Sequence, residues 1–293
     1  MASLKEIKNR IASVGSTLKI TSAMKMVASA KLHVAQTAIG NLLPYGNRLS
    51  GILAHLLRTA DADGPYLQAR PVKRLAVLAF ASNSSLCGAY NADVIKTVRR
   101  ILAEYKAAGV EEITVYSVGR KMAEAMRKSG YPSPEDYTAL SAKPGYAGAA
   151  ALADSLTAGF LSGKFDKVEI VYTHYKTTAS RTVTRMTYLP MSLDDAVPSA
   201  GPDGHASAAD DDVIVEPDAG TLLEKLLPMV ARIKVYTVLL DACEAEHSAR
   251  TVAMQAATDN GNELLRELTL EFNKGRQQKI TSEILDIVGG SVS

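Results

Sequence analysis

The stretch LKEIKNRIASVGSTLKITSAMKMVASAKL, from Leu4 to Leu32, decides the fold of this chain. Apolar residues recur along it at alternating steps of three and four, and the same register continues to Leu56. This alternation is typical of a helix that winds around a partner helix. Ser3 and Glu6 form a capping-box pattern at its start, and Pro44 predicts a kink or a local break. The positions in register are Leu4, Ile7, Ile11, Val14, Leu18, Thr21, Lys25, Ala28, Leu32, Ala35, Ile39, Leu42, Gly46, Leu49, Leu53 and Leu56.

The centre of this helical pattern carries little bulky apolar surface. Thr21, Lys25 and Ala28 occupy the register there, at positions where a paired helix normally buries large side chains. Lysines lie in and beside this centre, and no acidic residue occurs between Ile7 and Ala60. The sequence therefore predicts a helix that is apolar at both ends and contacts its partner weakly midway.

The C-terminal segment repeats this organisation. Its register is apolar at both ends and becomes polar or small between Glu244 and Gly261. From Met229 to Val288 the chain has 60 residues, which as one helix would extend about 90 Å. A single domain of this size cannot bury that length, so the excess must project and meet partner proteins. The positions in register are Leu223, Leu226, Val230, Ile233, Thr237, Leu240, Glu244, His247, Thr251, Met254, Thr258, Gly261, Leu265, Leu268 and Phe272.

The two terminal segments carry opposite charges. Residues 7–60 contain seven Lys or Arg and no acid, whereas residues 218–293 contain eight Lys or Arg against eleven Asp or Glu. Because these charges attract, we expect the two helices to pair as an antiparallel coiled coil. A basic arm also fits nucleic-acid binding, but Tyr45 is its only aromatic residue for base stacking. We therefore predict no nucleic-acid partner.

The middle of the chain follows a different pattern. Strand-like apolar runs at 74–81, 112–118, 167–176 and from 182 alternate with helical stretches at 91–107, 120–129 and 147–163. This alternation predicts a mostly parallel sheet covered by helices. The expected fold class is thus α/β, an antiparallel coiled coil of long N- and C-terminal helices plus a central Rossmann-like domain. The expected parts are 1–58 for the first helix, 72–192 for the Rossmann-like domain, 193–217 for an acidic flexible loop and 218–290 for the last helix.

Composition indicates a globular protein in a reducing compartment, for which the bacterial cytoplasm is the simplest assignment. Hydrophobic residues make up 47% and charged residues 22% of the chain, with a net charge of +2. No apolar run approaches the roughly 18 residues that cross a bilayer. The two cysteines, Cys87 and Cys243, do not suggest a disulfide framework.

One loop offers candidate chemistry. The segment SNSSLCGAYN, from Ser82 to Asn91, follows the first predicted strand, where open sheets bind ligands. It could bind an anion or use Cys87 as a nucleophile in a small-molecule enzyme, the alternative function. Turn chemistry around a buried thiol is favoured, because no histidine is near in sequence. Glu244 and His247 form one Glu-x-x-His without the second copy of di-iron bundles, so a solvated coiled-coil edge is expected. We predict no catalytic residue, metal or cofactor.

Four segments carry a specific resemblance. The stretch from Leu4 to Leu32, LCGAYN in the central loop, ARTVAMQAATDNGNEL (249–264) and NKGRQQKITSEILDIVGG (273–290) closely resemble the gamma subunit of F-type ATP synthases. They occur in the family's order, and the chain has the family's length.

This resemblance implies a non-catalytic rotor. In the family, the terminal helices form a coiled coil inside a ring of three alpha and three beta subunits. The Rossmann-like domain lies against the epsilon subunit and the membrane ring of c subunits. Turning of the coiled coil drives the beta sites through their states and couples proton flow to ATP synthesis. The implied location is the cytoplasmic side of a bacterial cell membrane, as a peripheral protein without a transmembrane segment.

The resemblance also implies contact residues. Met24 and Lys25 match the family's MKMV site, which faces a mobile loop of the beta subunit. The weak packing of this stretch then provides a bearing surface for the turning helix, and Met24 and Lys25 are expected to be its most exposed residues. The other matched positions, on the C-terminal helix, are Arg250, Arg276, Gln277, Thr281 and Glu283. The family's Ser-Asp-Arg-Gly before Leu-Cys-Gly is replaced here by Ser82, Asn83, Ser84 and Ser85, so the contact made by the Asp–Arg charges is in doubt. The chloroplast-type insertion with paired cysteines is missing, so thiol control is not expected.

Overall fold

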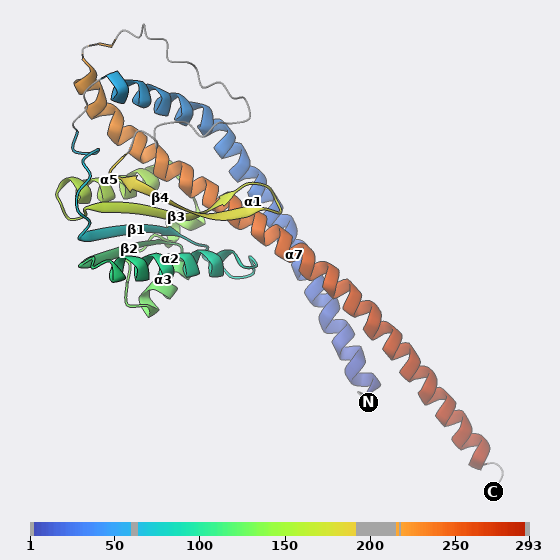
Figure 1. Ribbon diagram of the computed structural model, residues 1–293. Coiled ribbons are helices and arrows are strands. Elements are labelled where there is room, and N and C mark those ends of the chain that lie inside the picture. The colour runs from blue at the N-terminus through green and yellow to red at the C-terminus, as the bar shows by residue number, and fades with distance from the viewer. Residues whose placement is uncertain (1–2, 60–63, 192–214, 217, 291–293) are drawn as a thin grey trace. The chain divides into compact units, whose positions relative to one another are not determined.

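Two long helices begin and end the described chain. The computed structural model describes residues 3–59, 64–191, 215–216 and 218–290. Helix α1 spans Leu4–Thr59 and helix α7 spans Ala219–Gly290, which confirms the two predicted terminal helices. Helix α1 is not broken at Pro44 but continues through it, and its C-terminal half changes direction (Figure 1). The predicted acidic loop lies outside the described residues apart from Val215 and Glu216.

The chain divides into two units. Unit 1 contains Met1–Ala30 and Arg250–Ser293, and unit 2 contains Lys31–Ala249. In unit 1 the two helices run side by side in opposite directions (Figure 1). The predicted register is confirmed, since every register position of both helices is buried or half-buried. Among the described helices, none combines the length and the apolar content needed to cross a membrane.

Unit 2 contains a four-stranded sheet. Its order is β2-β1-β3-β4, with β1 parallel to β2 and to β3 and with β4 antiparallel to β3. The predicted mostly parallel sheet is thus confirmed, and its four strands lie where the apolar runs indicated. The antiparallel edge arises because β3 and β4 are joined by a short turn in which Lys176 N–H donates to the Ser180 carbonyl at 3.2 Å. The strands are β1 Arg74–Phe80, β2 Glu112–Val118, β3 Lys167–Tyr175 and β4 Arg181–Leu189.

Helices cover both faces of this sheet, as parallel strands require. Alternate residues of β1 point to opposite faces, so Val77 packs with α2 and α3 while Leu78 packs with α5 and α7. The helices are α2 Tyr90–Ala107, α3 Arg120–Lys128, α4 Thr138–Ala142 and α5 Tyr146–Leu161. Among the described helices, only the five-residue α4 was not predicted, because so short a helix has no readable period.

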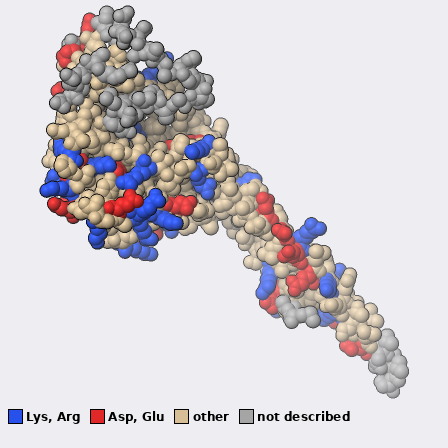
Figure 2. Space-filling model, in the orientation of Figure 1, with Lys and Arg blue, Asp and Glu red and all other residues tan. Residues whose placement is uncertain are grey.

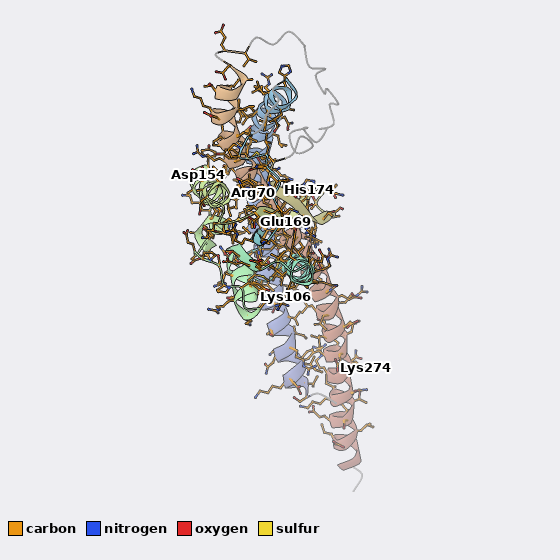
Figure 3. The ribbon with its side chains drawn as sticks, turned by 60° about the vertical axis from the view of Figure 1, so that its left-hand side comes forward. Arg70, Lys106, Asp154, Glu169, His174 and Lys274 are labelled. Carbon is orange, nitrogen blue, oxygen red and sulfur yellow. The ribbon has the colours of Figure 1, made fainter. Side chains whose placement is uncertain are left out.

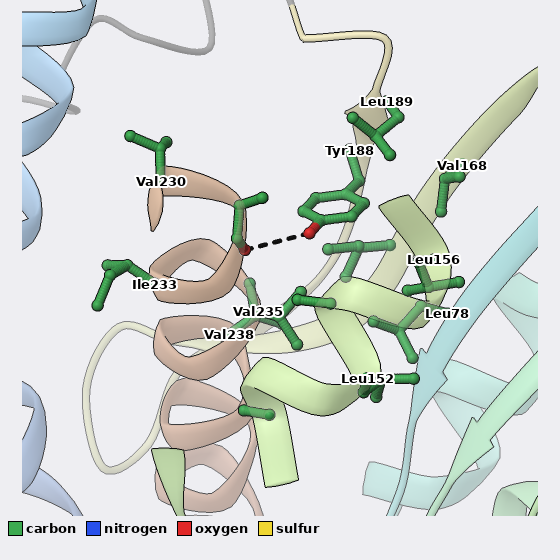
Figure 4. Close-up of a cluster of buried hydrophobic side chains, with 14 of the residues drawn as sticks. Leu78, Leu152, Leu156, Val168, Tyr188, Leu189, Val230, Ile233, Val235 and Val238 are labelled. Carbon is green, nitrogen blue, oxygen red and sulfur yellow. Dashed lines mark hydrogen bonds between the residues drawn. The ribbon is translucent and has the colours of Figure 1, made fainter. Parts of the chain in front are cut away.

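Within unit 2, helix α7 has two buried stripes. Val230 and Ile233 point toward α1, whereas Val235 and Val238 point toward α5 and the sheet (Figure 4). The second stripe also repeats at steps of three and four, and each of its members is at most 4% exposed. Its members are Ala231, Val235, Val238, Ala242, Ala245 and Ala249. Helix α7 is therefore covered on two sides here, which a single coiled-coil register did not predict.

Candidate functional site

All seven predicted contact residues lie in unit 1, but they form two separate groups. Met24 and Lys25 lie on α1, where α7 presents Gln255, and Arg250 lies on α7. The other four lie further along α7, beyond Gly275, which faces Leu4 at the start of α1. Figure 2 shows acidic and basic side chains mixed on the visible face of this helix pair, with uncharged surface between them.

The weak centre of the helix pair is a polar contact. The Lys25 ammonium donates to Gln255 Oε1 at 2.5 Å, and Gln255 Nε2 donates to the Asp259 carboxylate at 2.8 Å. One turn away, Thr258 Oγ1 donates to Thr21 Oγ1 at 3.0 Å. Hydrogen bonds therefore replace apolar packing at this point, and they fix the register of the pair without adding much burial free energy.

Met24 and Lys25 are not the most exposed residues of this stretch, contrary to expectation. Both are half-buried, because they flank the contact with α7. The exposed apolar side chains are instead Ile20, Met26 and Val27, which are 60%, 72% and 57% exposed. A partner that approaches the middle of α1 would touch these three residues first.

Arg250 lies deepest of the predicted residues. It is only 8% exposed, so most of its side chain lies against this chain. A partner protein can reach only a small part of its surface without a rearrangement. Sequence alone did not indicate this burial, because an arginine on a helix is usually exposed.

The end of α7 is the most open part of the site. Every described side chain from Arg276 to Ile287 is exposed, including Gln277, Thr281 and Glu283. Thr281 Oγ1 donates to the Gln277 carbonyl at 2.9 Å, and Glu283 lies 3.7 Å from Lys279 Nζ. Four large apolar side chains of this segment are about half exposed or more, and such a patch normally marks an interaction surface. They are Ile280, Ile284, Leu285 and Ile287.

Gly261 allows close contact between the helices of unit 1. A Cβ at Gly261 would lie 2.7 Å from Leu18 Cδ2, whereas a Cβ at Gly15 would meet no atom within 4 Å. Alanine in a helix interior is about 1 kcal/mol better than glycine. We expect Gly15→Ala to stabilise unit 1 by about that amount, and Gly261→Ala to change little because the contact with Leu18 offsets the gain. Amide hydrogen exchange in unit 1 measures both, and equal stabilisation by the two variants would contradict the close contact.

The Ser82–Asn91 loop contacts helix α7. Cys87 and Tyr90 are 1% and 2% exposed and pack against Ala245 and Ala249. The Cys87 sulfur accepts a hydrogen bond from Asn91 Nδ2 at 3.2 Å. A thiol buried in this way is not available to a substrate, so turn chemistry around a buried cysteine describes this loop.

The uncharged start of this loop has its own partners. The Arg120 amide donates to Asn83 Oδ1 at 2.8 Å, and Arg120 Nε donates to the Asn83 carbonyl at 3.0 Å. Asn83 Nδ2 also donates to the Thr138 carbonyl at 2.8 Å. An arginine from α3 therefore meets the loop at Asn83.

The Glu244–His247 pair does not lie on a solvated edge, which corrects the sequence-based interpretation. Glu244 is 6% exposed, because it lies where α7 is covered on two sides. Burial raises the pKa of its carboxyl, and a hydrogen bond from Gln36 partly opposes the rise. Among the described residues, no three His, Cys, Asp or Glu side chains gather so as to hold a metal ion.

Comparison with known proteins gives one consistent result. A family model described as ATP synthase matches residues 3–293. The ATP synthase gamma chain of Phocaeicola vulgatus is 51% identical, with 100% of both chains covered. That of Flavobacterium johnsoniae is 39% identical over 99% of this chain and 98% of the relative.

Solved structures share the fold. A chain of the Euglena gracilis mitochondrial ATP synthase has a TM-score of 0.64 and 20% identity, covering 99% of this chain and 93% of that chain. A chain of the central stalk and c-ring structure from Tetrahymena thermophila has a TM-score of 0.59 and 21% identity, covering 81% and 99%.

Proposed function

Because this chain belongs to the ATP synthase gamma-chain family, we propose that it is a rotor that couples ion flow through a membrane ring to the beta catalytic sites. The chain itself is a non-catalytic stalk subunit of the complex. Protons are the proposed coupling ion, as the resemblance implies. No cofactor enters this role.

The observation that carries the proposal is the polar centre of the helix pair in unit 1. A rotor must pass three similar beta loops in turn without binding tightly to one of them. Each buried methylene would add about 0.8 kcal/mol to the free energy of leaving. Hydrogen bonds inside the pair, such as Lys25 to Gln255, keep the helices in register without a large apolar patch.

The proposed partners follow from the same assignment. We assign Met24, Lys25, Arg250 and the exposed end of α7 to contacts with alpha and beta subunits, and add Met26 because it is 72% exposed. The α/β domain is assigned to the epsilon subunit and the ring of c subunits. The complex would hold this chain at the cytoplasmic side of a bacterial membrane as a peripheral protein.

Co-purification tests the assembly. An antibody against this chain, applied to detergent-solubilised membranes of the source organism, should recover alpha and beta subunits in fixed proportion. A salt wash that leaves the head intact should not separate the chain from it. Recovery of the chain apart from any alpha/beta hexamer would count decisively against the proposal.

A substitution at Met24 tests the contact with the beta loop. Met24→Lys places a second ammonium beside Lys25, whose own ammonium already bonds Gln255. An unbalanced charge at a close interface costs several kcal/mol or forms a new ion pair that holds one rotary state. We expect ATP hydrolysis to continue while fewer protons are pumped per ATP in reconstituted vesicles.

The volume-conserving Met24→Leu is the matched control and should pump normally. Ser29→Lys, at an exposed position of α1 that is assigned to no contact, separates a specific contact at residue 24 from a general effect of added charge. Unchanged proton pumping in Met24→Lys would refute the assignment of Met24.

A further inference from the structure

Two buried tyrosines of the α/β domain bind the backbone of α7. The Tyr90 hydroxyl donates to the Ala242 carbonyl at 3.0 Å. The Tyr188 hydroxyl donates to the Ala231 carbonyl at 3.1 Å, which is the dashed line in Figure 4. The tyrosines are 2% and 0% exposed, although they come from the start of α2 and the end of β4. Residues 231 and 242 are eleven apart, which is three helical turns, so both carbonyls lie on one face of α7.

Two charged contacts flank this face. Arg232 Nε lies 2.7 Å from Asp154 Oδ1 of α5, and Asp241 Oδ2 lies 2.6 Å from His174 Nδ1 of β3. Asp154 and His174 lie well apart in the view of Figure 3. At about 100° per residue, Arg232 lies about 100° to one side of Ala231 and Asp241 about 80° to the other.

The four contacts therefore hold α7 around about half of its circumference. Apolar packing keeps the helix close to the domain but is non-directional, so it sets the angle of the helix weakly. Hydrogen bonds weaken steeply when their angle changes, so contacts on both flanks resist turning in both senses. The alanines at 231 and 242 leave the carbonyls accessible to the tyrosine hydroxyls.

We infer that these contacts form a clamp that fixes the angle of α7 about its own axis and transmits torque from the α/β domain to the helix pair. The clamp consists of Tyr90, Asp154, His174 and Tyr188 of the domain, and of Ala231, Arg232, Asp241 and Ala242 of α7. The inference rests on the proposed rotor function. Within it, the four side chains of the domain are positioning residues.

The contacts of the clamp differ in strength. The side chains of Arg232 and Asp154 are 40% and 48% exposed, and exposed ion pairs contribute little. The Asp241 side chain is 14% exposed and also accepts a hydrogen bond from the Tyr175 amide at 2.8 Å. The two tyrosines and Asp241 therefore contribute most of the resistance to turning.

Torsional stiffness of the assembled complex tests the clamp. The head of alpha and beta subunits is fixed to a surface, and a bead is attached to the α/β domain of this chain. The thermal variance of the bead angle is then inversely proportional to the torsional stiffness of the connection between them. The double variant Tyr90→Phe/Tyr188→Phe removes two hydroxyls and keeps both rings in place. We expect the variance to rise by up to about threefold, since two of the three contacts that contribute most of the resistance are lost and hydrogen bonds of this type contribute similar free energies. The rate of ATP hydrolysis by the head should stay unchanged.

Tyr105→Phe is the matched control. The Tyr105 hydroxyl donates to Glu169 on β3, so this variant also removes a tyrosine hydrogen bond from the α/β domain, but not one to α7. Its bead variance should equal that of the wild type. Equal variance in the double variant and the wild type, or an equal rise in Tyr105→Phe, would overturn the clamp alone. A wild-type chain that neither assembles with the head nor rotates in it would overturn the proposed function and the clamp with it.

Discussion

Gly119→Ala is expected to lower the free energy of unfolding of the α/β domain by about 4 kcal/mol. Gly119 has φ 101° and ψ 140°, a combination that side chains rarely permit. A Cβ there would lie 2.0 Å from the Ala81 carbonyl oxygen. That backbone cannot move aside freely, because the Ala81 amide donates to the Val118 carbonyl at 2.9 Å at the end of the β1–β2 pairing.

Urea unfolding followed by circular dichroism measures this loss. Gly109→Ala is the matched control, because Gly109 also has a positive φ of 81° but no atom within 4 Å of an added Cβ. The control should cost only about 1 to 2 kcal/mol, from backbone strain alone. An equal loss in both variants would show that the contact with Ala81 is relieved at no cost.

The effect of Gly119→Ala should reach helix α7. Ala81 directly precedes the Ser82–Asn91 loop, and the Ser82 carbonyl accepts a hydrogen bond from the Lys121 amide at 3.1 Å. Tyr90, which follows in that loop, donates to the Ala242 carbonyl. A shift at Ala81 therefore displaces a residue of the clamp, so the variant should combine lower stability with lower torsional stiffness.

The second large effect is expected at Arg185, which binds a buried carboxylate. Glu169 is 2% exposed, and Arg185 meets both of its oxygens, at 2.8 Å and 3.2 Å. Lys167 Nζ lies 2.8 Å from the same carboxylate, that of Glu169, which is labelled in Figure 3. Arg185→Met removes two hydrogen bonds and one of two neighbouring cations from this buried carboxylate, so it should cost about 3 kcal/mol of unfolding free energy near neutral pH.

The pH dependence of this loss has a defined sign. Burial disfavours the charged form of Glu169, but hydrogen bonds from Arg185, Lys167 and Tyr105 outweigh it, so its pKa is lowered from the usual 4.5. A lowered folded-state pKa stabilises the fold above the unfolded-state pKa, and this stability is lost as pH falls through the folded value. In Arg185→Met the pKa of Glu169 should rise toward its unfolded-state value, so the acid-dependent loss from this group should be smaller and complete at higher pH than in the wild type.

Urea unfolding between about pH 3 and pH 7 measures both effects. Glu169→Gln in the Arg185→Met background removes the titrating carboxylate and should flatten the acid dependence. Glu104→Gln is the matched control, because Glu104 also lies 2.8 Å from Arg185 but its side chain is 49% exposed. It should cost less than about 1 kcal/mol, and a larger loss there than in Arg185→Met would contradict the role of burial.

Periodicity in the sequence predicted most of the fold. The heptad register from Leu4 to Leu56 and its C-terminal counterpart identified both long helices, and their opposite charges indicated the antiparallel pairing. The strand-like apolar runs identified the four strands of the described sheet. Such patterns are local, because each residue's place on a helix or strand depends only on its spacing from its neighbours. The family resemblance then named the contact residues, but their roles remain proposals.

The exposure of the site residues could not be predicted in the same way. Met24 and Met26 are two positions apart on one helix, yet only Met26 is largely exposed. Arg250 and Glu244 are charged residues on a helix, and both are buried. Their burial depends on which other elements pack against α7, and those elements lie far away in the sequence.

The sequence by itself determined the two paired terminal helices, the mostly parallel sheet and the weak centre of the coiled coil. Only the tertiary structure decided that α7 carries a second stripe, from Ala231 to Ala249, against the α/β domain. A signal for that stripe exists in the alanines spaced at three and four, but small residues alone do not reveal a partner. The clamp joins Tyr90 to Ala242 and Tyr188 to Ala231, and hydrogen bonds between residues so distant in sequence form only after both elements have packed.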